Sequence, residues 1–344
     1  MIYVGVDLHL QFCYMTVLDA SGVQLQQGRV LNDANSLCAF FNGLKKPGQE
    51  QEKILVAVEA CGFWCAFVDC VEPLVARVVL VHPAKVKAIA SAKLKNDRVD
   101  SQTLAQLLRA DLLPEAWKAD LATRDLRGLM RLRIALAQDR TRYKNQIHAV
   151  LHQHGERAPQ SDVFGRSGRA WLAQVSVRSA ARQALDTSLR LVDQLDQEVL
   201  GLDQQLRQIA KEDPDAHFLM TIPGIGAFTA MVLKAEIGDI HRFPDKKSLF
   251  NYAGLVPVIR ESAEHRRSGG ITRAGSRQLR WVMSEAAMTA ARYSPAARAW
   301  FTRLARRKHM WRAQRWRANC WARCGRYGPT EFVSTSEFLR RCER

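Results

Sequence analysis

Among the 8 cysteines of this 344-residue chain, no two are spaced as C-x₂-C, which argues against a zinc-ribbon site. No apolar run approaches the roughly 20 residues that a membrane-spanning helix needs. We find no signal peptide, and therefore expect a protein of the reducing cytoplasm. Acids are also scarce relative to bases, with 34 Asp and Glu against 51 Lys and Arg, a net charge of +17. This excess predicts a polyanionic partner, most simply nucleic acid.

The first third of the chain alternates short apolar runs with helical patterns. Runs rich in β-branched and aromatic residues predict strands, and apolar residues on one side of a longer stretch predict helices. The strands are expected at 2–8, 11–18, 23–30, 54–59 and 76–81, and the helices at 32–44, at 68–74 and from 97 onward. Because the strands are almost continuously apolar, both faces of their sheet must be covered, which predicts an α/β domain.

Four acids stand where an α/β sheet assembles its sites. Asp7 and Glu59 each end a predicted buried strand, and Asp97 and Asp100 lie one turn apart near a helix start. Alone, the helix pair is explained by the helix dipole, and either strand-end acid by a cap or a rim charge. Together, four carboxylates can hold two Mg²⁺ or Mn²⁺ ions for phosphodiester chemistry, as acids do in the RNase H-like fold.

The middle of the chain is expected to be helical. Residues 124–151 form a long helical pattern whose polar side has far more bases than acids, which favours a phosphate track over an ordinary solvated face. The bases are Arg124, Arg127, Arg131, Arg133, Arg140, Arg142 and Lys144. Residues 185–209 carry apolar residues at spacings of three and four, which predicts a coiled-coil seam. It is either an intramolecular hairpin or a dimer contact, and the sequence does not decide.

The segment 221–226, Thr-Ile-Pro-Gly-Ile-Gly, joins two expected helices. It resembles the helix-hairpin-helix element that binds DNA, in which glycines let the backbone approach and helix N-terminal amides bind a phosphate. We therefore expect Gly224 and Gly226 to contact DNA. A tight turn between helices explains the same residues without a ligand, so both interpretations stay open.

The segment 260–280 surrounds three serines with cations. The bases expected to bind DNA are Arg260, Arg266, Arg267, Arg273 and Arg277. A serine among cations is well placed to attack a phosphate, because the cations stabilise the charge that develops. On chemistry alone a loop serine is more often only a hydrogen-bonding residue, and Ser262, Ser268 and Ser276 cannot be ranked.

Taken in order over residues 1–295, these motifs resemble one family, the DEDD-type transposases of bacterial insertion sequences (the IS110 family), which also contains the Piv-type DNA invertases. The matching pieces are V-G-V-D with Asp7, V-A-V-E-A-C-G with Glu59, K-N-D-R-V-D with Asp97 and Asp100, I-P-G-I-G, N-Y-A-G-L-V-P, R-E-S and G-I-T-R-A-G-S-R-Q-L-R. Ser101 departs from the alanine that the family more often has after the second aspartate.

The resemblance implies four parts. They are a RuvC-like α/β domain at 1–120, a basic helix and coiled-coil linker at 121–215, a mainly helical transposase domain with a helix-hairpin-helix-like element at 216–300, and an Arg/Trp-rich tail at 301–344. The resemblance implies that the four acids bind Mg²⁺. It implies that Ser262, aligned to the family's G-L-x-P-x-x-x-x-S pattern, becomes joined to DNA. It also implies guidance by a structured RNA from the element's own ends.

We predict a transposase or recombinase that acts on double-stranded DNA at the bacterial nucleoid, as a homodimer or homotetramer without membrane attachment. A RuvC-like junction nuclease that uses water, a non-enzymatic DNA/RNA-binding protein and a Piv-type invertase are the alternatives. The tail departs from the family pattern. Its tryptophans either stack on nucleic acid bases or result from a shifted reading frame.

Overall fold

The computed structural model describes residues 1–45, 53–89, 96–262 and 265–305, and at 88, 259–268, 304 and 305 it describes only the backbone. The chain divides into two compact units, Met1–Lys118 and Ala119–Arg344. Residues 306–344 of the expected tail, and with them the tryptophans discussed above, lie outside the described part. The division into four parts stays a prediction.

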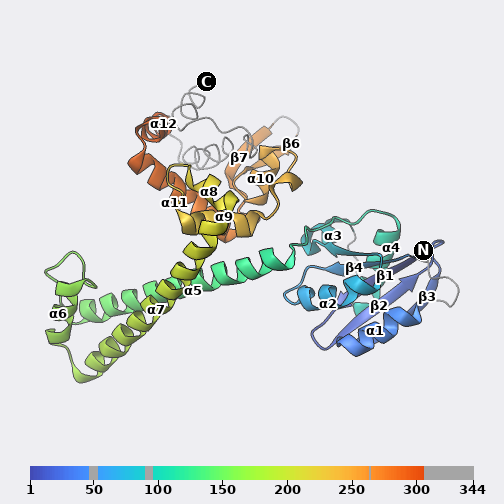
Figure 1. Ribbon diagram of the computed structural model, residues 1–344, viewed down its shortest axis with the longest axis horizontal. Helices are drawn as coiled ribbons and strands as arrows, with labels where there is room; N and C mark the ends of the chain where they lie inside the picture. Colours follow the sequence, from blue (N-terminus) through green and yellow to red (C-terminus); the bar gives the residue numbers. More distant parts are fainter. Residues whose placement is uncertain (46–52, 90–95, 263–264, 306–344) are drawn as a thin grey trace. The chain divides into compact units, whose positions relative to one another are not determined.

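A mixed five-stranded sheet forms the centre of the first unit (Figure 1). Its strands are β1 (Ile2–Leu8), β2 (Phe12–Leu18), β3 (Gln24–Leu31), β4 (Ile54–Glu59) and β5 (Arg77–Val81). Their order is β3-β2-β1-β4-β5, with β1, β4 and β5 parallel and β2 antiparallel to both its neighbours. Each strand begins and ends within one residue of its predicted range, and the expectation of an α/β region followed by helices is confirmed.

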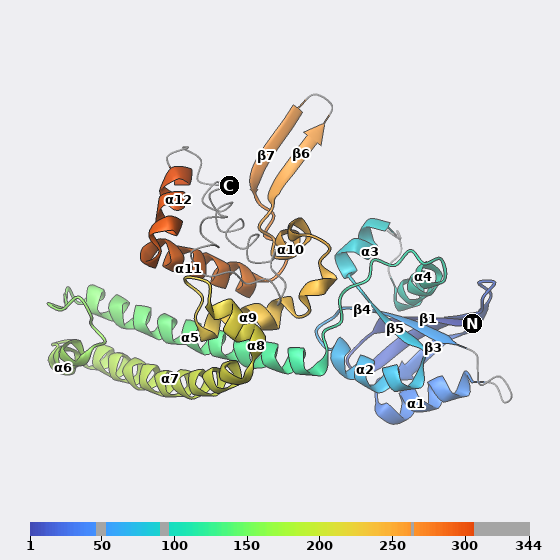
Figure 2. The same ribbon diagram turned by 45° about the horizontal axis from the view of Figure 1, so that its top comes forward.

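Helices cover both faces of this sheet. They are α1 (Ala34–Gly43), α2 (Trp64–Val71), the short 3₁₀ helix η1 (Glu72–Leu74), α3 (Pro83–Ile89) and α4 (Asp97–Arg109). On one face Val6 and Val58 pack with Phe41 of α1 and Phe67 of α2. On the other face the strand residues pack against Leu104 and its neighbours in α4. Figure 2 shows α4 on one side of the sheet and α1 and α2 on the other.

Two long helices begin the second unit. These are α5 (Leu121–Gln153) and α7 (Ser179–Glu212), connected through the shorter α6 (Arg166–Gln174). Ion pairs join Arg133 to Asp203 and Arg140 to Asp196. Because a higher residue number on α5 is paired with a lower one on α7, the two helices run antiparallel. Four buried apolar residues of α7 recur every seven positions, at Leu185, Val192, Val199 and Leu206. Three of them, Leu185, Val192 and Leu206, pack with buried residues of α5, so the predicted coiled-coil seam forms an intramolecular hairpin in the described part of the chain.

The basic side of α5 is largely engaged inside the chain, which corrects the expectation of a phosphate track there. The ion pairs are Arg131–Glu236, Arg133–Asp203, Arg140–Asp196 and Arg142–Asp139. In addition, Arg127 donates from Nε to the carbonyl of Ala235 at 2.6 Å and from Nη2 to that of Glu236 at 3.0 Å. Most of these partners lie on α7 and on a later helix, so the imbalance within the α5 sequence is offset once the chain folds.

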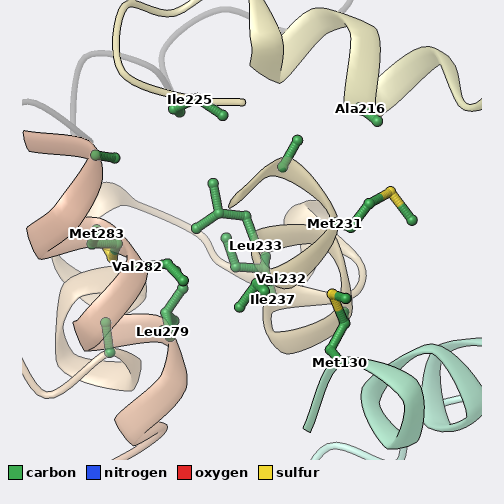
Figure 3. Packing of buried hydrophobic residues seen from close by; sticks show 14 of the residues in the cluster. Met130, Ala216, Ile225, Met231, Val232, Leu233, Ile237, Leu279, Val282 and Met283 are labelled. Carbon is green, nitrogen blue, oxygen red and sulfur yellow. The ribbon is translucent and has the colours of Figure 1, made fainter. Parts of the chain in front are cut away.

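The remaining elements pack around one apolar helix. They are α8 (Pro214–Met220), α9 (Ala227–Ile237), the 3₁₀ helix η2 (Ile240–Arg242), α10 (Lys246–Tyr252), β6 (Pro257–Ser262), β7 (His265–Ile271), α11 (Arg277–Tyr293) and α12 (Pro295–Ala305). Met231, Val232 and Leu233 of α9 are fully buried and meet Met130 from α5 and Val282 from α11 (Figure 3). No described helix is both long and apolar enough to cross a membrane.

Candidate functional site

Asp7 and Glu59 end neighbouring parallel strands. β1 and β4 pair in register as far as Val6 opposite Val58, so the two acids come next on each strand, at the carboxyl edge where α/β sites form. Side chains alternate along a strand. Both acids therefore belong to the opposite face from Val6 and Val58, which is the face that α4 covers.

The other two acids begin α4. Asn96 caps this helix, its side-chain oxygen accepting a hydrogen bond from the amide of Val99 at 2.8 Å. The cap places Asp97 and Asp100 in the first helical turn, where the helix dipole favours negative charge. The N-terminal end of α4 thus presents two carboxylates over the sheet face to which Asp7 and Glu59 belong.

A glycine brings α4 close to the sheet. A Cβ on Gly5 would lie 2.0 Å from the carbonyl oxygen of Ser101 and 2.4 Å from the amide nitrogen of Ala105. The backbone of the helix therefore rests directly on β1, and any side chain at this position would push it away. A buried 2.8 Å hydrogen bond between the hydroxyls of Ser101 and Thr16 joins α4 to β2. Ser101, the departure from the family pattern, thus takes part in holding the acids over the sheet.

Asp7, His9 and Asp97 form a tight cluster. The Nε2 atom of His9 lies 3.3 Å from an Oδ2 atom of each aspartate, and one ligand atom from each residue lies within 4.8 Å of the other two. Burial raises the pKa of Asp7 above its usual value, and the negative charges of Asp97 and Asp100 add to this, while His9 opposes it. Asp100 and Glu59 are outside this group of three within the described ranges, although the charge of Asp100 reaches Asp7.

The cluster fits a divalent cation on chemical grounds. Carboxylate oxygens are the ligands that Mg²⁺ prefers, and negative charges that disfavour one another are relieved by a bound cation. The Nε2 atom of His9 is buried and has no hydrogen-bond partner, as expected of an atom that awaits another ligand. The carboxylates of Asp7 and Asp97 would hold the ion, with Asp100 and Glu59 at the same edge.

Sequence reasoning missed His9, although the sequence carried a signal for it. A residue two positions after Asp7 continues the alternation of the strand toward the same face. Its ring stacks on Phe12, with centroids 4.5 Å apart and planes 23° from parallel. The carbonyl of His9 accepts a hydrogen bond from Asn32 Nδ2 at 3.0 Å. These contacts hold the turn between β1 and β2, and with it the imidazole.

The two glycines expected to contact DNA differ in their surroundings. Gly224 has a φ of 90°, and a Cβ there would lie 2.3 Å from the carbonyl oxygen of Ala286 in α11. Close packing on α11 is thus reason enough for a glycine at 224. Gly226 is exposed, precedes α9 as its N-cap without a side-chain cap bond, and has no atom within 4 Å of an added Cβ. Gly226 therefore has an approachable backbone.

Ser262 is the last residue of β6, and its backbone pairs with His265 at the start of β7. The side chains of Ser262, Arg260, Arg266 and Arg267 lie outside the described part of the chain. The hydroxyl of Ser276, by contrast, is described. It caps α11 and accepts a hydrogen bond from the amide of Leu279 at 3.1 Å, so Ser276 has a structural role.

Arg273 and Arg277 lie exposed beside Arg280. Burial lowers the pKa of Arg280, and the positive charges of Arg273 and Arg277 lower it further, which shows that the three cations are close. Neighbouring cations repel one another unless an anion lies between them. This group is therefore an electrostatically favourable place for a phosphate.

Two family models match the chain. One, a transposase model named for the DEDD transposases of IS110, matches residues 4–155. The other, described as the transposase IS116/IS110/IS902 family, matches residues 216–302. The chain belongs to the IS110 family of transposases. The first match contains the four acids, and the second contains the Gly-rich segment 221–226 and Ser262. The predicted site residues of this IS110-family chain thus lie within the two matched regions.

Relatives of this IS110-family chain include a transposase for insertion sequence element IS1111A from Coxiella burnetii, 26% identical over 245 residues, or 69% of this chain and 66% of the relative. A putative transposase y4qE from Sinorhizobium fredii is 26% identical over 225 residues, 63% of this chain and 53% of the relative. An insertion element IS116 protein from Streptomyces clavuligerus is 26% identical over 345 residues, 84% of each chain. The chain thus spans slightly less than two thirds of the first relative and about half of the second.

Proposed function

We propose that the protein cuts and rejoins DNA at the ends of an insertion sequence, with Ser262 as the nucleophile and the acids of the first unit as the metal site. The observation that carries the proposal is the cluster of Asp7 and Asp97 around His9, with ligand atoms within 4.8 Å of one another. Glu59 and Asp100 complete the proposed set of four acids. A bound Mg²⁺ or Mn²⁺ ion would favour ionisation of the attacking hydroxyl and stabilise the leaving oxygen.

In the proposed step the Ser262 oxygen forms a bond to the phosphorus of a DNA strand. One bridging P–O bond breaks, and the released deoxyribose oxygen takes up a proton as the serine loses one. The number of phosphate ester bonds is unchanged. The broken strand can therefore be rejoined to another DNA end without an external energy source. Attack by such an oxygen needs cations near the phosphate, a role we assign to Arg260, Arg266 and Arg267.

DNA and RNA are the proposed partners. The net charge of +17 suits a large polyanionic load, and its effect on affinity will be steeply salt-dependent. We assign DNA backbone contacts to the exposed cations Arg273 and Arg277, and to the approachable backbone of Gly226. We assign a DNA contact to Gly224 as well, in addition to its close packing on α11. A structured guide RNA, and assembly as a homodimer or homotetramer, belong to the same proposal.

Trapping a covalent adduct tests the serine. Full-length protein is incubated with its element-end DNA, the RNA transcribed beside the gene and Mg²⁺, and is then resolved under denaturing conditions. The wild type should give a protein–DNA adduct that survives denaturation, and Ser262→Ala should give none. Ser268→Ala is the matched control, because Ser268 lies on the partner strand of the same hairpin, and it should form the adduct.

A junction nuclease that uses water is the second candidate. It is favoured by the fact that all four acids belong to the first unit, which needs no residue from the second to hold a cation. A nuclease would cut DNA without forming an adduct, and Ser262→Ala would cut as well as the wild type. A non-enzymatic binding protein would give neither product, and Asp97→Asn would change nothing. An invertase would form the same adduct and differ only in the DNA that it recombines.

A further inference from the structure

We propose that His9 supplies a nitrogen ligand to the cation held by Asp7 and Asp97, and that this nitrogen makes the site prefer Mn²⁺ to Mg²⁺. The inference rests on the proposed function, since that function places the cation at these acids. It goes further in naming a ligand outside the four acids, and in choosing between two cations that four carboxylates alone would bind on similar terms.

The spacing of the three residues is that of ligands around a small cation. In an octahedral site with metal–ligand distances near 2.1 Å, adjacent ligand atoms are about 3 Å apart. The Nε2 atom of His9 lies 3.3 Å from Oδ2 of Asp7 and 3.3 Å from Oδ2 of Asp97. Nε2 is buried, and neither contact has the geometry of a hydrogen bond. A metal takes the lone pair of a neutral imidazole, so a cation at this point would replace the attraction that His9 exerts on Asp7.

The imidazole is held in this position before any cation arrives. One face of the ring stacks on Phe12, and the guanidinium of Arg29 lies 3.7 Å above the Phe12 ring centroid. The main chain at His9 is fixed by two hydrogen bonds, from its amide to the carbonyl of Phe12 at 2.9 Å and from Asn32 Nδ2 to its own carbonyl at 3.0 Å. A ligand whose side chain and backbone are both held loses little freedom on binding.

The type of ligand atom decides which cation the site binds more tightly. Mg²⁺ prefers oxygen ligands and gives up its water molecules reluctantly. Imidazole is a common ligand for first-row transition metals, and manganese is one of these metals whereas magnesium is not. Replacing one water or carboxylate oxygen by His9 Nε2 therefore favours Mn²⁺. Gln at position 9 would offer an oxygen in place of the nitrogen, so His9→Gln should remove the preference while leaving an oxygen-rich site.

The test uses full-length protein with Mn²⁺ alone as the probe. Electron spin echo spectroscopy of bound Mn²⁺ detects a directly coordinated ¹⁴N nucleus, and calorimetry measures the affinities for Mn²⁺ and Mg²⁺. The wild type should show the ¹⁴N modulation. His9→Gln should lose it, with at least about tenfold weaker Mn²⁺ binding and an Mg²⁺ affinity within about threefold of the wild type. His82→Gln is the matched control, because His82 is an exposed histidine of the same unit outside the cluster, and it should behave as the wild type.

Two results would overturn the inference. One is wild-type protein that binds Mn²⁺ without ¹⁴N modulation, an outcome that does not depend on the folding of any variant. The other is an equal loss of Mn²⁺ and Mg²⁺ affinity in His9→Gln, which would make His9 a residue that only positions the carboxylates. Asp7→Asn separates this failure from a failure of the proposed function. If Asp7→Asn binds Mn²⁺ as tightly as the wild type, the acids hold no cation and the proposed function itself falls.

Discussion

Gly5→Ala should separate the acids of α4 from those of the sheet. The added Cβ would lie 2.0 Å from the carbonyl oxygen of Ser101 and 2.4 Å from the amide nitrogen of Ala105. Both are backbone atoms in the middle of α4, so neither can rotate away as a flexible side chain could. The helix must instead move off β1, and Asp97, at its first turn, moves with it.

The magnitude follows from the contact distances. An ordinary contact to a Cβ begins near 3.4 Å, so relief of the clash requires a helix displacement of somewhat more than about 1 Å in a closely packed interior. Overpacking of this kind costs about 1–3 kcal/mol of stability. A misplacement of about 1 Å at reacting groups can cost about a hundredfold in rate. A hundredfold loss of rate corresponds to about 2.7 kcal/mol of activation free energy, so strand cutting and stability should fall by similar free energies.

Hydrogen–deuterium exchange of the peptide 97–109, together with the Mn²⁺ affinity of the full-length protein, measures the effect. Gly5→Ala should exchange faster throughout this peptide and bind Mn²⁺ more weakly. Gly28→Ala is the matched control, because Gly28 lies in the same sheet and a Cβ there meets nothing within 4 Å. Wild-type exchange and affinity in Gly5→Ala would refute the claim that contact with Gly5 positions the acids.

Three further changes test the account. Burial and neighbouring acids raise the pKa of Asp7. Without divalent cations, the free energy of unfolding should therefore fall as the pH rises from the unfolded-state pKa of about 3.9 through the raised pKa of the folded state. Asp7→Asn should remove this fall and be more stable than the wild type at pH 7, as measured by urea denaturation. Arg131→Ala leaves the 2% exposed Glu236 without its ion pair to an arginine whose own side chain is 53% exposed; because solvent screens this pair, the change should cost about 1–2 kcal/mol by thermal melting, and adding Glu236→Gln should restore part of it. Thr16→Val removes both the buried bond to Ser101 and the 2.8 Å bond that Thr16 Oγ1 accepts from Gln27 Nε2 and should cost about 1–3 kcal/mol, whereas stability equal to the wild type would show that the two bonds contribute nothing.

The positions of the strands and the approach of Asp97 to Asp7 could be predicted from the sequence. Apolar runs ending in acids fix both the strands and the edge at which those acids lie, and parallel strands present their carboxyl ends together. The capping residue Asn96 and the acids that follow it fix the start of α4. What brings α4 into contact with the sheet is Gly5, whose role depends on a backbone about one hundred residues away, so no local pattern reveals it.

The basic face of α5 shows why other expectations failed. Arg131 and Arg133 appear unbalanced within their own helix, yet their partners Glu236 and Asp203 come from α9 and α7. Charge counting along one helix cannot find such partners, because they meet only after folding. The close packing of Gly224 on Ala286 of α11 likewise appears only after folding, and the expected contact of Gly224 with DNA stays a prediction.

Crystals of the full-length protein soaked in Mn²⁺, with diffraction collected at the manganese edge, test the central claim most directly. We predict an anomalous peak bounded by the carboxylates of Asp7 and Asp97 and by the imidazole of His9. A map with no peak at these residues, or with its strongest peak elsewhere in the chain, would contradict it.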